Sequence, residues 1–168
     1  NTNYNKLYLF NPATRQLTFK EHTKAAIYAY LVDSFGREWV GTRGDGLYVD
    51  KQRYAKESPT HVVPVNDFYD IKEDAHHRLW IATWKGGLLC ATGGKGHPIT
   101  FRQFLTHNNN AAKIHDLELS PDGRLYIATY DGLYAVDTRR QHITENDFMA
   151  YKVDNKQLPA NEIYCLKK

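Results

Sequence analysis

A segment that occurs three times constrains the fold of this chain more than any other feature. Each copy contains a strand-like run that ends in an aromatic, an aliphatic, a small residue and threonine: Trp39-Val40-Gly41-Thr42, Trp80-Ile81-Ala82-Thr83 and Tyr126-Ile127-Ala128-Thr129. A turn that ends in glycine follows each run, then a leucine, and the period is a little over forty residues. Repeats of this length, built from strands and tight turns, are typical of four-stranded β-propeller blades.

Each repeat divides into strands and turns. The first strands are predicted at residues 27–32, 68–73 and 114–119. Polar turns follow them, such as Ser120-Pro121-Asp122-Gly123, in which glycine tolerates positive φ and proline presets the bend. The small residue before each threonine (Gly41, Ala82, Ala128) indicates a close approach, which we assign to the neighbouring blade. Looser fourth strands are expected near residues 62–65, 99–105 and 148–153.

The remaining segments continue the same pattern. Residues 7–10 and 16–20 match the third and fourth strands of a preceding blade, and residues 163–166 match the first strand of a following one. The prediction is an all-β fold, a partial β-propeller of about three four-stranded blades plus flanking strands of two incomplete blades. Its divisions are 1–26 for the end of a blade, 27–67, 68–113 and 114–162 for three blades, and 163–168 for the next strand. We therefore expect this chain to be a piece of a longer polypeptide.

Composition excludes several classes of function. The net charge of +3 comes from 22 basic and 19 acidic residues that are scattered along the chain, whereas nucleic-acid binders gather basic residues into a patch. No run of about 18 apolar residues exists, so we expect no membrane segment. The adjacent His76 and His77 in a turn and the absence of an HExxH pattern argue against a metal site. No cofactor is expected.

The two cysteines, Cys90 and Cys165, each lie in an apolar strand-like run. Buried core thiols are the favoured interpretation. A disulfide between them in an oxidising compartment stays open, because sequence alone does not decide pairing.

The segment from Asp33 to Tyr48 resembles the two-component regulator propeller repeat, with one extra residue before Gly46. The later copies depart from that pattern, since Ala82 and Ala128 replace a glycine, His77 replaces the turn glycine and Tyr126 replaces the tryptophan. Residues 157–163 resemble the usual entry into the next blade of that family.

The resemblance implies a sensor. Proteins with such repeats are typically the periplasmic part of hybrid two-component systems of Bacteroides-type bacteria, anchored in the inner membrane and followed by a cytoplasmic histidine kinase. Their blades form one or two seven-bladed rings, and many detect oligosaccharides. The expected function is a non-catalytic, periplasmic, ligand-sensing propeller segment. The expected partners are an oligosaccharide and the remaining blades of the parent chain.

Candidate ligand-binding residues lie in loops on the face where propellers usually bind partners. Aromatic rings beside charged and amide groups suit a sugar, because its apolar face stacks on a ring while its hydroxyls need donors and acceptors. The candidates are Arg43, Asp45, Trp84, Lys85, Tyr130 and Asp131, with Asn66, Asp67, Asn108, Asn109, Asn110 and Lys113 in the same loops. Ordinary solvated loop residues remain the competing interpretation. Trp84 is the strongest candidate, since a bulky aromatic in a turn lacks an obvious role in the core.

A second group of residues lies on the predicted first strands: Tyr28, Tyr69, His115 and Tyr164, with Asp70 and Asp116 beside two of them. These side chains either line a central channel or pack between blades with hydroxyls bonded to the backbone, and packing is slightly favoured.

Other functions are weaker. Some glycan-active enzymes are propellers, but Ser120-Pro121-Asp122-Gly123 misses the sialidase-type aspartate box and no nucleophile motif is present, so no catalytic residue is predicted. A protein-interaction scaffold is the main alternative, although the Gly-His and Trp-Asp signatures of WD repeats are absent. Because a partial ring has unpaired edges, we also expect self-association.

Overall fold

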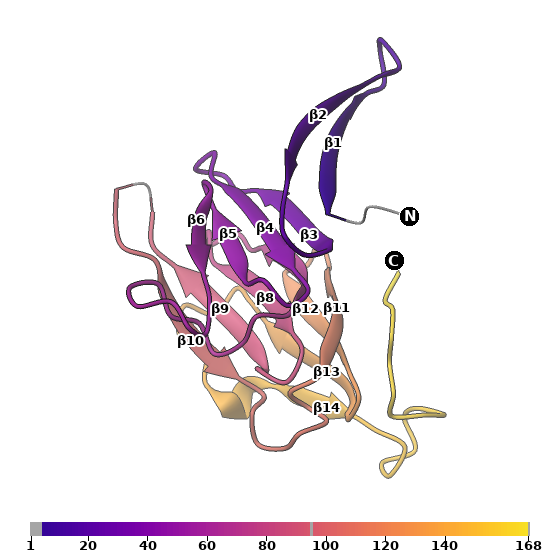
Figure 1. The fold of residues 1–168 in the computed structure, drawn as a ribbon. Helices are drawn as coiled ribbons and strands as arrows, with labels where there is room; N and C mark the ends of the chain where they lie inside the picture. Colours follow the sequence, from indigo (N-terminus) through magenta and orange to yellow (C-terminus); the bar gives the residue numbers. More distant parts are fainter. Residues whose placement is uncertain (1–4, 95, 168) are drawn as a thin grey trace.

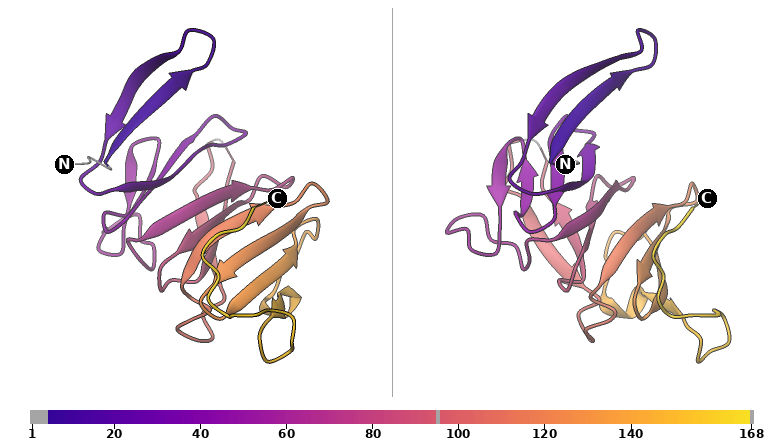
Figure 2. Two further views of the ribbon diagram at one scale, coloured as in Figure 1. Left: turned by 90° about the vertical axis from the view of Figure 1, so that its right-hand side faces the viewer. Right: turned by 45° about the vertical axis from the view of Figure 1, so that its right-hand side comes forward.

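The computed structural model describes residues 5–94 and 96–167. Its strands form one two-stranded hairpin and three four-stranded antiparallel sheets, in each of which successive strands pair as a meander. The sheets pack face to face in chain order and the hairpin projects from them (Figures 1 and 2). This arrangement confirms the all-β, partial-propeller prediction.

The strands have these bounds. The hairpin is β1 (Lys6–Asn11) and β2 (Gln16–His22). The first sheet is β3 (Ile27–Val32), β4 (Glu38–Thr42), β5 (Leu47–Val49) and β6 (Gln52–Tyr54). The second is β7 (Phe68–Glu73), β8 (Leu79–Thr83), β9 (Leu88–Thr92) and β10 (Thr100–Phe104). The third is β11 (Ile114–Leu119), β12 (Arg124–Thr129), β13 (Gly132–Asp137) and β14 (Met149–Tyr151), with a 3₁₀ turn at Glu145–Asp147 before β14.

The first turn of each sheet has one backbone geometry. In the first sheet the Asp33 N–H donates to the Arg37 carbonyl at 3.0 Å, and the same turn places Gly36 at φ +80°. Gly123 repeats this in the third sheet, but in the second His77 takes the position at φ +59°. Left-handed backbone is uncommon for any residue other than glycine. The packed strands therefore impose the turn on a residue that does not favour it.

The predicted fourth strand at residues 62–65 is wrong. The first sheet ends instead with β6, because Asp50 and Lys51 both adopt positive φ and make a tight turn directly after β5. The valine run that suggested a strand makes one isolated bridge, between Val62 and Ala55. Apolar character misled the prediction here, since Val63 is buried in the cluster between the first two sheets while Val62 is exposed.

Two hydrophobic clusters fill the spaces between the sheets. Residues of the second sheet alternate between them: Leu79 and Ile81 pack toward the first sheet, and Trp80 and Ala82 pack toward the third. All four side chains are fully buried. A strand buried on both faces has this period of two, so the central sheet belongs equally to both clusters.

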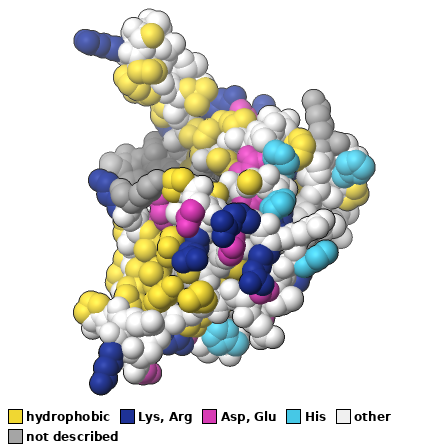
Figure 3. All heavy atoms as spheres, turned by 180° about the vertical axis from the view of Figure 1, so that it is seen from behind, with side chains coloured by type: hydrophobic (Ala, Val, Ile, Leu, Met, Phe, Trp, Pro, Cys, Tyr) yellow, Lys and Arg dark blue, Asp and Glu magenta, His cyan; other side chains and the backbone are white. Residues whose placement is uncertain are grey.

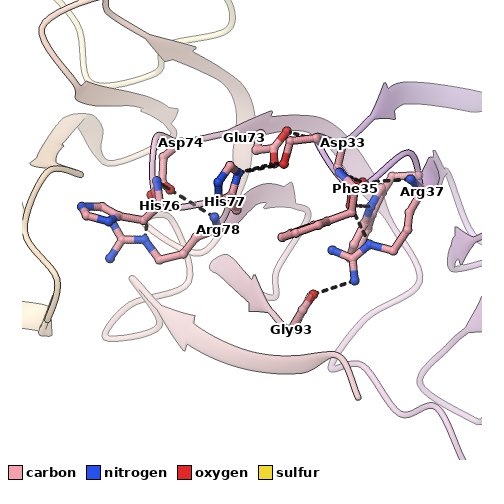
Figure 4. A network of polar contacts seen from close by, with 11 residues as sticks. Asp33, Phe35, Arg37, Glu73, Asp74, His76, His77, Arg78 and Gly93 are labelled. Carbon is pink, nitrogen blue, oxygen red and sulfur yellow. Dashed lines mark hydrogen bonds and ion pairs between the residues drawn. The ribbon is translucent and has the colours of Figure 1, made fainter. Parts of the chain in front are cut away.

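A buried carboxylate links each of the first two sheets to its neighbour (Figure 4). The carboxylate of Asp74 accepts hydrogen bonds from Arg78 Nε at 2.7 Å and from Trp80 Nε1 at 2.8 Å. The guanidinium of Arg78 then donates to the Arg140 carbonyl at 2.9 Å and to the Thr138 carbonyl, both beyond the end of β13. The first sheet repeats the arrangement with Asp33, Arg37 and Trp39, and Arg37 reaches the Gly93 carbonyl of the second sheet at 2.6 Å. We call each set an aspartate clasp.

The end of the described chain differs from its prediction in detail. Residues 163–166 were expected to be a first strand, but in the structure they are extended without a strand ladder. Ile163 N–H donates to the Thr129 carbonyl at 2.9 Å, and Leu166 N–H donates to the Asp116 carboxylate at 2.7 Å. This segment therefore lies beside the third sheet, in the place expected for the first strand of a following blade.

The cysteines differ in environment. Cys90 is buried in β9, and burial raises the pKa of its thiol to about 12. Cys165 is exposed, so the core-thiol interpretation is wrong for this residue, and both thiols are free.

Within residues 5–94 and 96–167, no helix is long and apolar enough to cross a membrane.

Candidate functional site

The site begins with an irregularity that recurs in all three first strands. In the first sheet Ile27 pairs with Thr42 and Ala29 with Gly41, so Tyr28 between them has no opposite residue. Equivalent register shifts leave Tyr69 and His115 unpaired in the second and third sheets. A β-bulge of this kind bends the strand and re-aims the extra side chain. Three bulges at one repeat position thus direct three rings toward one region.

Three loop residues meet these rings. Arg43, Trp84 and Tyr130 each follow the threonine that ends a second strand. The Trp84 N–H donates to the Asp67 carbonyl at 3.1 Å, and the Tyr130 N–H donates to the Lys113 carbonyl at 3.3 Å. The preceding threonine hydroxyls close the turns on a glycine carbonyl, as Thr83 does on Gly87 at 2.6 Å. These hydrogen bonds fix the backbone position of the loop residues and so the direction from which each side chain enters the site.

Together the two groups line an open hollow of about 550 Å³. It is lined by Tyr28, Arg43, Tyr69, Trp84, His115 and Tyr130. We call it the aromatic hollow. It lies beside the first strands of the three sheets, β3, β7 and β11, which are neighbours in space.

The rings of the aromatic hollow form a continuous series. The centroids of Tyr28 and Tyr69 are 5.2 Å apart, those of Tyr69 and His115 are 5.2 Å apart, and Trp84 lies 5.2 Å from Tyr130. His115 and Tyr130 stack at 5.3 Å with an interplanar angle of 27°. Tilted and edge-on contacts at 4.5–7 Å are the arrangements that aromatic pairs prefer. The hollow therefore has aromatic walls held by one another.

Two cations lie on these walls. The Nζ of Lys113 is 5.7 Å from the Trp84 ring centroid and 5.4 Å from that of Tyr130. Arg43 Nη1 donates to the Tyr28 hydroxyl at 3.4 Å, and this bond, helped by nearby phenols and Asp67, raises the pKa of the guanidinium. Burial lowers the pKa of the His115 imidazole, with Asp116 opposing, so this ring is neutral at pH 7. Positive charge thus comes from Arg43 and Lys113.

Three of the six predicted site residues line the aromatic hollow: Arg43, Trp84 and Tyr130. The other three point elsewhere. Asp45 accepts a hydrogen bond from the Tyr48 hydroxyl at 2.7 Å and pairs with Arg53 at 3.2 Å. Asp131 likewise accepts hydrogen bonds from the Tyr134 hydroxyl and from Lys152 Nζ. The Asp45 and Asp131 carboxylates therefore bind side chains near the third and fourth strands of their own sheets.

Lys85, the remaining predicted residue, is exposed and has φ +68°. It does not line the aromatic hollow, although it directly follows Trp84. A role of any of the six residues in ligand binding stays a prediction.

The second group of predicted residues is brought into the same place. Tyr28, Tyr69 and His115 both pack on one another and line the aromatic hollow, and Tyr164 lies 5.2 Å from His115. Their hydroxyls are not all hydrogen-bonded to the backbone, because the Tyr164 hydroxyl donates to the Glu162 carboxylate at 3.1 Å. In the described part of the chain, the buried Nε2 of His115 makes no hydrogen bond.

Sequence reasoning missed the union of the two groups. It treated the loop residues as the ligand-binding candidates and the first-strand residues as a separate group. The signal was present as an aromatic or histidine at one repeat position in each first strand, next to alanine or aspartate. Only the register of the ladder shows that this position is the extra residue.

A second hollow, of about 460 Å³, lies near Arg37, Tyr54 and Ile99. It is less suited to a ligand, because the polar groups of Arg37 are already bound to Asp33 and the Gly93 carbonyl. Among the described residues no group of three or more His, Cys, Asp or Glu is placed to hold a metal ion. The aromatic hollow offers stacking surfaces and two cations, which suit binding.

Comparison with known proteins matches part of this chain to a named repeat. Residues 63–85, which include Trp84, match the family model described as two component regulator propeller. This chain carries that repeat. The match confirms the resemblance for this segment, and no curated protein matches the chain.

Solved structures share the fold over most of the chain. The extracellular domain named for the hybrid two component system BT3049 of B. thetaiotaomicron is 20% identical, with a TM-score of 0.62 over 91% of this chain. Virginiamycin B lyase of Staphylococcus aureus is 13% identical, with a TM-score of 0.60 over 89%. PorZ, a surface component of the type-IX secretion system of Porphyromonas gingivalis, is 12% identical, with a TM-score of 0.59 over 92%.

The chain spans only part of each of these structures: 21% of the first, 49% of the second and 25% of the third. At these identities the likeness shows the fold alone. The chemistry of the lyase therefore does not transfer to this chain.

Proposed function

We propose that this chain is a non-catalytic, ligand-sensing segment of an extracytoplasmic propeller in a hybrid two-component regulator. The aromatic hollow binds an oligosaccharide, and its occupancy is passed to a cytoplasmic histidine kinase of the parent protein, which is anchored in the inner membrane. The observation that carries the proposal is the convergence of five rings and a guanidinium on one hollow of about 550 Å³.

The chemistry of the hollow supports a sugar. The apolar face of a pyranose stacks on an aromatic ring, and Trp84 and Tyr130 each offer one beside a polar side chain. Pockets that bind small molecules typically combine apolar walls with a few polar groups that fix orientation. The two component regulator propeller match and the fold shared with an extracellular domain of a hybrid system favour the sensor role.

Sensing also needs a difference in affinity between two states of the parent protein. The hollow is built from all three sheets, since its residues come from β3, β7 and β11 and from the loops after β4, β8 and β12. A ligand that fills it contacts three blades at once. Its binding therefore favours one relative arrangement of the blades, and that is the physical basis we propose for transmission.

The test is a thermal-shift screen of the purified chain against a panel of defined oligosaccharides, because a ligand that binds only the folded state raises stability. We expect one sugar class to raise the melting temperature. Trp84→Ala should abolish the shift, and Phe10→Ala, which removes an exposed ring on the hairpin, should leave it unchanged. Circular dichroism confirms that each variant is folded.

Three results would contradict the proposal. A shift that survives Trp84→Ala would place the sugar outside the aromatic hollow. The absence of a shift with every sugar would favour a protein or peptide ligand, the scaffold alternative. Cleavage of any oligosaccharide during the screen would contradict the non-catalytic role.

A further inference from the structure

We propose that the ligand of the aromatic hollow is an anionic saccharide, one whose carboxylate or sulfate groups are bound by Arg43 and Lys113. The inference rests on the proposed function and names the chemical class of its ligand. It follows from the position of the two cations on the aromatic rings and from their lack of a carboxylate partner among the described residues.

Several basic side chains near the sheets have a carboxylate partner. Arg53 pairs with Glu57 at 2.5 Å, Lys72 with Asp70 at 2.7 Å and Lys152 with Asp131 at 2.5 Å. Among the residues that the structure describes, neither Arg43 nor Lys113 has a carboxylate within ion-pair distance. Both cations beside the aromatic rings of the hollow thus keep their capacity to bind an anion.

Lys113 is held over the rings by a neutral partner. Its Nζ donates to the Asn110 Oδ1 at 3.0 Å while it lies above Trp84 and Tyr130. Cation–π contacts keep an ammonium beside an aromatic surface without neutralising its charge. A sugar stacked on Trp84 would therefore bring an acidic substituent next to this ammonium.

Arg43 occupies the other part of the ring series. It is exposed, it bonds the Tyr28 hydroxyl through one nitrogen, and its fork retains further N–H donors. Asp67 interacts electrostatically with Arg43 but makes no ion pair with it in the described part of the chain. A guanidinium with free donors binds carboxylate or sulfate oxygens well, in part because two parallel hydrogen bonds form.

The remaining acidic groups around the hollow are engaged. Asp116 accepts from the N–H groups of Leu117 and Leu166, and Asp70 accepts from those of Ile71 and Leu117. These carboxylates face backbone donors and not the cations. Since the cations lie toward opposite ends of the ring series, an acidic oligosaccharide fits better than a single acidic sugar.

The experiment is calorimetric titration of the purified chain with two matched pairs of sugars. One pair is trigalacturonate and its carboxyl-reduced counterpart, and the other is a sulfated neocarrabiose and its desulfated form. We expect one acidic member to bind about tenfold or more tightly than its neutral partner, as hydrogen bonds to charged groups predict. The pair that shows the difference tells carboxylate from sulfate.

Variants assign the difference to the two cations. Arg43→Gln and Lys113→Gln should each weaken the acidic sugar by about tenfold and leave the neutral one unchanged. The matched control is Lys85→Gln, an exposed lysine next to Trp84 that does not line the hollow, and it should change neither.

Equal affinity for acidic and neutral sugars, with no effect of Arg43→Gln or Lys113→Gln, would overturn the anionic class and leave the proposed function standing. Loss of affinity for both members of a pair in these variants would also overturn it, because the cations would then bind hydroxyls. Failure of all four sugars to bind, with thermal shifts given only by neutral sugars of the panel, would overturn the anionic class and leave the proposed function standing.

Discussion

At the scale of single residues, one buried carboxylate organises a turn and a contact between blades at the same time. The Asp74 side chain is fully buried and accepts from the backbone N–H groups of His76 and Arg78 as well as from two side chains. Arg78, which it orients, reaches carbonyls of the third sheet. The aspartate clasp thus couples the local turn to the packing of the next blade.

We expect Asp74→Asn to lower the free energy of unfolding by about 3–5 kcal/mol, because removing one partner leaves the Arg78 guanidinium buried and uncompensated. Chemical denaturation monitored by circular dichroism measures the loss. Asp154→Asn, at an exposed carboxylate, serves as the control and should stay within about 0.5 kcal/mol. A loss below about 1 kcal/mol for Asp74→Asn would show that the clasp does not stabilise the blades.

His115 gives the chain a pH dependence with a definite sign. Burial lowers the pKa of this imidazole in the folded state, with Asp116 opposing. The unfolded chain therefore takes up a proton that the folded chain resists, and this contribution to stability is full above the unfolded pKa of about 6.5 and is lost as the pH falls below it.

The equivalent position in the other sheets is tyrosine, so His115→Tyr removes the titration with little change of shape. Between pH 7.5 and pH 5.5, we expect the free energy of unfolding to fall less in this variant than in the unsubstituted chain. Denaturation midpoints at the two pH values measure it, with the exposed His142→Tyr as the control. Equal pH dependence in all three proteins would show that His115 titrates normally.

At the scale of elements, the contact between adjacent blades is set by a pair of residues. A Cβ placed on Gly41 would lie 2.9 Å from the Cβ of Phe68, the first residue of β7. At the next interface Ala82 and Ile114 occupy the equivalent positions, and both are fully buried in one cluster. A smaller residue on one blade thus accompanies a larger one on the next, which confirms the predicted close approach for Gly41.

Gly41→Ala should therefore cost about 1–3 kcal/mol, as overpacking of a filled core does. The second change Phe68→Ile reproduces the pair of the next interface, and we expect the double variant to recover about 1 kcal/mol relative to the sum of the single effects. Chemical denaturation of the unsubstituted chain, the two single variants and the double variant gives the coupling free energy between the two positions. Strict additivity would mean that the two positions do not pack against each other.

The elements show how far sequence carries. The first three strands of each sheet were predictable, because turn residues and apolar alternation occur together. The fourth strand of the first sheet was not, since β6 depends on positive φ at Asp50 and Lys51, residues without a glycine signal. The aromatic hollow was half predictable: Trp84 stood out in a turn, but the bulge that brings Tyr69 to it depends on a one-residue shift of register.

At the scale of the whole molecule, exposed hydrophobic side chains gather on the hairpin: Tyr8, Leu9, Phe10, Leu17 and Phe19. Phe10 and Leu17 pair across β1 and β2 and are 60% and 67% exposed. In Figure 3 hydrophobic side chains gather on the projecting hairpin at the top and again on the lower left of the body, while charged side chains and histidines are mixed over the middle of the body. Exposed apolar faces of strands recruit other chains.

We therefore expect the purified chain to associate with a second copy through this hairpin. Light scattering coupled to size exclusion should give a mass above that of one chain at high concentration. Leu17→Lys should restore the monomer, while Val62→Lys, at an equally exposed valine outside the hairpin, should not. A monomer at every concentration would refute this expectation.

The central claim, that a saccharide occupies the aromatic hollow, is most directly tested by tryptophan fluorescence. Of the three tryptophans, Trp39 and Trp80 are fully buried, and Trp84 lines the hollow. During titration with the acidic sugar that calorimetry identifies, the emission should change and saturate at the affinity that calorimetry gives. Trp84→Phe should remove the signal while calorimetry still detects binding. Calorimetric binding of a saccharide without a change in the emission of the unsubstituted chain would contradict the account. So would the failure of every saccharide to bind.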